Sequence, residues 1–148
     1  MSELPSAIDA FRADEHAELP DARVEDDFTE LQRAAELIEL ERLRRLAEID
    51  RRRMYERDGH LSAASWLTAS HGVARGLAQR DVKTARALGQ MPATRRALED
   101  AEISMSAARL LSDARDVEPE LFAESEGTLV EAARGHSISE LQRVVAFW

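Results

Sequence analysis

The sequence predicts an all-α protein, and three observations lead to this fold class. Ala, Leu, Arg and Glu, which favour helices, are abundant, whereas aromatic residues make up only 5% of the chain. Val, Ile and aromatic residues never alternate with polar residues over a useful length, so strands are not expected. Ser, Gly and Pro recur where helices begin and end. We expect a multi-helix bundle with a long N-terminal helix and helix-turn-helix-like hairpins.

Residues 1–23 are expected to be an acidic arm, separate from a helical domain formed by residues 24–148. The main apolar anchors of this arm are Ile8, Phe11 and Leu19. Because the segment has little to bury, two alternatives stay open. Either a short helix forms around residues 7–15 or the whole arm is flexible.

Residues 24–57 are predicted to form one long helix, because this stretch holds neither Gly nor Pro. Its acidic beginning and the arginines at its end suit the helix dipole. Placed on a helical wheel, its apolar residues form two adjacent arcs, which together are wider than the stripe of a surface helix. Either both arcs pack inside the domain, or Leu40 and Leu43 face a second copy of the chain.

Residues 58–88 are predicted to form two helices joined by a tight turn. Ser62 is a good N-cap for the first helix, and Trp66 with Leu67 gives it an apolar face. Gly72 favours the left-handed conformation that ends many helices. A second helix is expected over residues 74–88, which makes a helix-turn-helix arrangement.

Four more helices are expected after this hairpin. Pro92 suits the first position of a helix that reaches residue 100, and Ser104 caps a helix through residue 115. A further helix spans residues 120–134, and Ser137 begins a capping box for the last one. Because the chain stops on apolar residues, we expect either a fragment of a longer domain or an end that packs against a partner. The candidates for self-association are Leu40, Leu43, Phe147 and Trp148.

The helix over residues 74–88 has a polar face opposite its apolar face. We call the five polar residues of this face the cationic arc: Arg75, Gln79, Arg80, Lys83 and Arg86. These side chains either contact DNA phosphates or form an ordinary solvated surface. Asp81 lies within the apolar face, where a carboxylate is costly unless paired. We therefore expect Asp81 to bind an arginine or the indole N–H of Trp66.

The net charge of −9 argues against indiscriminate nucleic-acid binding, but the charge is unevenly distributed. Residues 1–30 carry a net charge of −8 and residues 116–148 a net charge of −5. Residues 31–60 and 61–115 carry +1 and +3. The cationic arc therefore lies in a mildly basic region between two acidic ends.

Several motifs together resemble one bacterial family, the domain of unknown function 222, also called the thirteen-E-twelve repeat family. They are Gly59 with Ser62 and Trp66-Leu67, then Ala85-Arg86-x-Leu88, Pro92 with Ala97, and Ile103-Ser104. Glu102 departs from the family, which commonly has glycine there. The resemblance covers residues 31–148 and implies a domain that precedes an HNH endonuclease module. A role in DNA recognition or targeting follows, with the nuclease module C-terminal to this chain or separate from it. The alternative is a protein-interaction or oligomerisation module.

No catalytic set of residues is recognised in the sequence. It has no cysteine, and His16, His60, His71 and His136 are isolated from one another. Glycine-rich phosphate-binding loops are also missing. We therefore predict no catalytic residue, no metal site and no cofactor for this chain by itself. No stretch approaches the roughly 20 apolar residues of a membrane span, so a cytoplasmic protein without membrane contact is expected.

Overall fold

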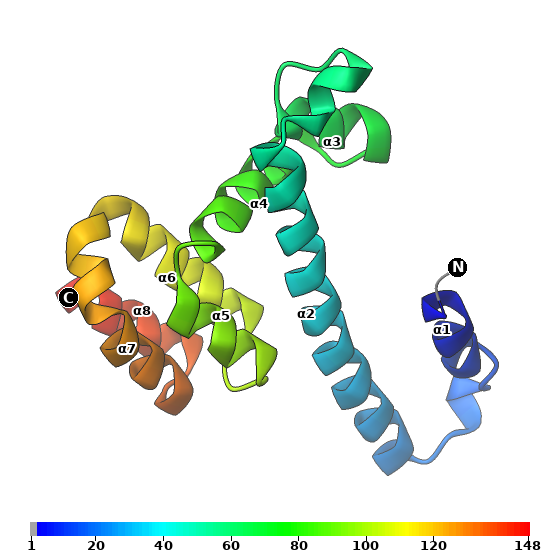
Figure 1. Ribbon diagram of the computed structural model, residues 1–148. Helices are drawn as coiled ribbons and strands as arrows, with labels where there is room; N and C mark the ends of the chain where they lie inside the picture. The colour runs from blue at the N-terminus through cyan, green and yellow to red at the C-terminus, as the bar shows by residue number, and fades with distance from the viewer. Residues whose placement is uncertain (1–2) are drawn as a thin grey trace. The chain divides into compact units, whose positions relative to one another are not determined.

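The computed structural model describes residues 3–148, and Figure 1 shows this part of the chain. It contains eight α-helices, two 3₁₀-helices and no strand within those residues, which confirms the all-α prediction. The chain divides after Ala35 into two compact units. We call residues 1–35 the N-terminal unit and residues 36–148 the C-terminal unit.

The N-terminal unit is helical. For residues 1–23 the sequence had allowed either a short helix or a flexible arm. Its elements are α1 (Leu4–Arg12), η1 (His16–Glu18) and the first part of α2 (Asp21–Arg51). The boundary expected between residues 23 and 24 falls inside α2, which continues past the division into the C-terminal unit. None of residues 3–35 is buried.

The long helix ends earlier than the sequence predicted. We expected it to reach residue 57, but α2 stops at Arg51. Arg53 adopts a left-handed backbone with φ of 54°, and η2 (Met54–Asp58) follows. This conformation costs a non-glycine residue about 1–2 kcal/mol. The turn places Tyr55 in the core, where its side chain is 8% exposed, so tertiary packing offsets the strain.

The expected hairpin of two helices is present as α3 (Ala63–His71) and α4 (Arg75–Leu88). The Ser62 hydroxyl oxygen accepts a hydrogen bond from the Ser65 backbone N–H at 3.0 Å. Gly72 ends α3 with φ of 67°, in the left-handed region that glycine adopts without strain. Both predicted signals therefore operate as the sequence indicated.

The remaining helices of the C-terminal unit are α5 (Pro92–Glu99), α6 (Met105–Val117), α7 (Pro119–Gly135) and α8 (Ile138–Phe147). Ser104 and Ser137 cap α6 and α8, accepting the Ala107 and Glu140 backbone N–H groups at 3.1 and 3.2 Å. Helix α6 contacts α4, α5, α7 and α8, as Figure 1 shows, and forms the centre of the bundle.

Helix α5 receives its N-terminal cap from a different helix. Glu126 of α7 is 8% exposed, and one of its carboxylate oxygens accepts two hydrogen bonds from Thr94. The backbone N–H of Thr94 donates at 2.9 Å and its hydroxyl at 2.8 Å. The positive end of the α5 dipole also favours a carboxylate here. A buried polar contact thus fixes α5 against α7.

The buried apolar side chains of the described residues lie between Leu40 and Leu141. Leu40 and Leu43 are 2% and 1% exposed, so they pack inside the C-terminal unit and cannot form a contact surface for a second copy. Of the two alternatives for the long helix, the structure therefore has the one in which Leu40 and Leu43 pack inside the domain. Their choice as candidates for self-association was wrong. Phe147 is 92% exposed, while Trp148 packs edge-on against Phe122 with ring centroids 6.2 Å apart.

Candidate nucleic-acid interface

Most of the apolar residues expected on the core face of α4 are buried, but Leu77, which was expected there too, is 53% exposed. Its buried face includes Ala78, Val82, Ala85 and Leu88. All members of the cationic arc are exposed on the opposite side: Arg75, Gln79, Arg80, Lys83 and Arg86. Exposed side chains of this kind can reach an external ligand. Whether each one is available to an anionic ligand depends on whether an acidic residue of the chain already pairs with it.

The buried carboxylate of α4 has arginine partners, as expected. Asp81 is 8% exposed and pairs with Arg42 of α2 at 3.0 Å and with Arg109 of α6 at 3.6 Å. Arg109 also pairs with Glu39 at 3.2 Å and donates a hydrogen bond to the Thr84 hydroxyl at 3.1 Å. We call these five residues the Asp81 network.

The Asp81 network joins three helices that are far apart in the sequence. Glu36 of α2 adds a further link, because its carboxylate accepts the backbone N–H of Met105 at 3.2 Å, at the start of α6. Charged groups in a partly buried position hold their partners in defined geometry. The network therefore fixes the rotation of α4 and directs the cationic arc outward.

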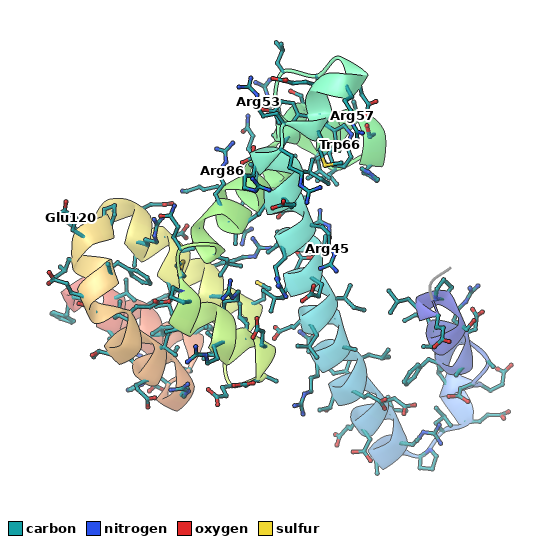
Figure 2. All side chains as sticks on the ribbon, viewed as in Figure 1. Arg45, Arg53, Arg57, Trp66, Arg86 and Glu120 are labelled. Carbon is teal, nitrogen blue, oxygen red and sulfur yellow. The ribbon has the colours of Figure 1, made fainter. Side chains whose placement is uncertain are left out.

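The C-terminal half of the cationic arc is neutralised by the chain itself. The Lys83 ammonium lies 2.7 Å from Asp116, and this hydrogen bond raises the pKa of Lys83. Two nitrogens of the Arg86 guanidinium donate to the two carboxylate oxygens of Asp50, at 2.6 and 2.8 Å. Figure 2 labels Arg86 beside the end of α2. The carboxylate that Arg86 binds is therefore Asp50, whereas Asp81 binds Arg42 and Arg109.

The N-terminal half of the cationic arc is not neutralised. Within residues 3–148, neither Arg75 nor Arg80 forms an ion pair. Arg75 and Gln79 line a groove of about 580 Å³ between α3 and α4. The other polar residues that line it come from α3 and the segment before it: His60, Ser62, Ser65 and Thr68.

Sequence reasoning missed most of this groove. Ser62 was recognised only as a helix cap, and His60, Ser65 and Thr68 carried no motif. The Thr68 hydroxyl oxygen is buried and has no hydrogen-bond partner within the described residues. Ser65 and Thr68 lie three residues apart on one face of α3, and Ser62, the N-cap of that helix, precedes Ser65 by three, so this spacing was a usable signal. Their meeting with Arg75 depends on how α3 packs against α4.

Trp66 and His71 shape the opposite side of α3. Their rings meet edge-on, with centroids 5.0 Å apart at an interplanar angle of 68°. Both line a pocket of about 450 Å³, to which α2 contributes the apolar residues Leu46 and Ile49 and the arginines Arg42 and Arg45. Figure 2 shows Trp66 in this region. Trp66 is partly buried and packs against the apolar core of the C-terminal unit.

Comparison with protein-family models, curated proteins and solved structures gives no match to this chain. The resemblance to the domain of unknown function 222 therefore stays a prediction. In residues 3–148, His, Asp and Glu side chains do not gather in groups of three that could hold a metal ion. Across the same residues, none of the helices combines the length and apolar character needed to cross a membrane.

Proposed function

We propose that this chain is a non-catalytic domain that positions DNA for a nuclease module. The N-terminal half of the cationic arc and the groove beside it contact the phosphate backbone. The observation that carries this proposal is the pair of exposed arginines on α4, Arg75 and Arg80, which form no ion pair within residues 3–148. Arg75 also lines a groove with Ser and Thr residues. The family resemblance to HNH-associated proteins supports the same role.

The chemistry of the groove suits a phosphate group. Ser and Thr hydroxyls, the Gln79 amide and arginines are the groups that most often bind phosphate oxygens in DNA complexes. The positive end of the α4 dipole lies beside Arg75 and adds to the attraction. Lys83 and Arg86 are left out of the proposed contact, because Asp116 and Asp50 already occupy them.

The expected affinity is modest. Contacts from Arg75 and Arg80 to two phosphates would give a slope of about −2 in a plot of log affinity against log salt. The net charge of −9 opposes DNA at long range. Binding should therefore be measurable at low salt and weak at physiological salt.

A pair of matched double variants tests the proposal. Arg75→Glu with Arg80→Glu should abolish binding of a DNA duplex, followed by fluorescence anisotropy at several salt concentrations. Arg96→Glu with Arg143→Glu is the control, because both arginines are exposed without an ion pair in residues 3–148 and the change in net charge is the same. The control should keep the slope of about −2. If the two double variants bind DNA equally well, the cationic arc is only a solvated surface.

A protein-interaction module is the second candidate, and exposed apolar side chains favour it. Phe28 and Phe147 are 66% and 92% exposed. Sedimentation of the purified chain over a range of concentrations distinguishes the two candidates: self-association without DNA binding supports the interaction module.

A further inference from the structure

The N-terminal unit contains an apolar groove of its own. Helix α1, η1 and the beginning of α2 enclose about 400 Å³. Phe11, Leu19 and Leu31 are half-buried at its walls. Three more apolar side chains at the groove are largely exposed, with Ile8 at 43%, Val24 at 44% and Phe28 at 66%.

This groove is open because two helices cannot complete a core. None of residues 3–35 is buried, although the unit presents six large apolar side chains to one space. Each amphipathic helix needs a neighbour over its whole apolar stripe, which in a helical unit requires at least one more helix. Exposed apolar surfaces surrounded by polar residues mark sites of protein contact.

The segment that forms the groove is strongly acidic, whereas the polar residues that line the groove itself are Arg12, His16 and Asp27. Residues 1–35 hold ten acidic and three basic side chains. Arg12 pairs with Asp9 at 3.4 Å, and Arg23 pairs with Asp14 at 3.6 Å and Asp27 at 3.1 Å. The acidic residues that form no ion pair within residues 3–148 include Glu15, Glu18, Asp21, Glu25, Asp26 and Glu30.

We infer that this groove binds a cationic amphipathic helix of a partner protein. The apolar stripe of that helix would complete a three-helix core, and its Lys and Arg side chains would face the unpaired carboxylates. A second copy of the chain fits less well, because it would bring the same ten acidic residues against the first set. Helix α1 has 9 residues and is about 13 Å long, so the groove accommodates a helix of a few turns.

Three synthetic peptides of equal length test the inference on the full chain. The first has a Leu stripe at helical spacing with Lys elsewhere, the second the same Leu stripe with Glu, and the third the Lys residues with Ser in place of Leu. We expect only the first to bind in fluorescence anisotropy, with an affinity that falls as salt increases. If the first two peptides bind equally, the acidic residues do not select a cationic partner. If the first and third bind equally, the apolar groove is not used and the attraction is electrostatic only. Either result contradicts the inference.

A pair of Phe variants locates the contact. Phe28→Ser should weaken binding of the Leu-Lys peptide about tenfold, the effect of losing 1.4 kcal/mol of contact energy. Phe147→Ser removes another exposed Phe, outside the groove, and should leave binding unchanged. Equal effects of the two variants, or no peptide binding at all, would overturn the inference. So would a dimer that Phe28→Ser dissociates, because the occupant would then be a second copy.

The result is independent of DNA binding. Arg75→Glu with Arg80→Glu lies outside the groove and should leave peptide binding intact. Loss of DNA binding in that double variant therefore leaves the docking surface unaffected, and a failure of peptide binding leaves the proposed DNA contact unaffected.

Discussion

Glu48 illustrates how single residues stabilise the end of α2. Its carboxylate accepts hydrogen bonds from Arg51 and from Arg52, the latter at 2.7 Å. These bonds lower the pKa of Glu48 from 4.5 to about 2. The pairs lie one helical turn apart, at positions i, i+3 and i+4, so the sequence alone places them within reach.

The lowered pKa of Glu48 predicts a contribution to stability that depends on pH. Because the folded pKa lies below the unfolded value, the contribution is complete above pH 4.5 and is lost as the pH falls toward 2. The carboxyl carbon of Glu48 should titrate in NMR near pH 2. In Glu48→Gln, the urea midpoint should fall less between pH 6 and pH 3 than in the parent. Glu124→Gln removes an exposed, unpaired carboxylate as the control, and an identical acid response in both variants would contradict this reading.

At the scale of helices, the Asp81 network holds α2, α4 and α6 in one arrangement. Two arginines from different helices share the carboxylate of Asp81, and Arg109 also reaches Glu39. The direction of the cationic arc follows from this arrangement, because α4 cannot rotate without breaking these contacts. The proposed DNA contact thus depends on residues that never touch DNA.

We predict that Asp81→Ala lowers the free energy of unfolding by about 2 kcal/mol. Removing one partner of a buried pair typically costs more, but Arg42 keeps 37% of its side chain exposed and can turn to water. Urea unfolding followed by circular dichroism measures the loss. Asp113→Ala, an exposed position on α6, should change the free energy by less than about 0.5 kcal/mol. Equal losses in the two variants would show that the network contributes nothing beyond a surface charge.

At the scale of the whole molecule, the two units differ in how they are stabilised. The C-terminal unit has a continuous apolar core from Leu40 to Leu141, whereas residues 3–35 bury none of their side chains. The N-terminal unit therefore relies on its ion pairs and partly covered apolar residues. This difference explains why the inferred docking surface lies there.

Truncation should separate the two units. A chain of residues 36–148 keeps Glu36 and the whole core, so its melting temperature should stay within about 4 °C of the parent. A chain of residues 47–148 lacks Leu40, Leu43 and Leu46, three core residues, and should lose cooperative unfolding. Calorimetry compares the two. A large drop for the longer chain would show that residues 1–35 stabilise the core directly.

The sequence by itself determined the fold class and most helix boundaries. Ser62, Ser104 and Ser137 cap helices, and Gly72 ends one, through bonds that span at most four residues. Such local signals are legible in a sequence because the groups involved are already neighbours along the chain. The sequence also indicated that Asp81 needs a partner. The apolar periodicity of α4 places this carboxylate on the buried face of the helix, where an arginine can pair with it.

Only the tertiary structure decided which residues meet across the chain. Asp50 neutralises Arg86 from 36 positions away, and Asp116 neutralises Lys83. Among residues 3–148, Arg75 and Arg80 are then the cations of the arc without an ion pair. Packing of Tyr55 into the core stopped α2 at Arg51, although no glycine or proline marks that position. These outcomes depend on long-range packing. The local sequence around each residue is compatible with several distant partners, and the free energy of the whole fold decides which partner it contacts.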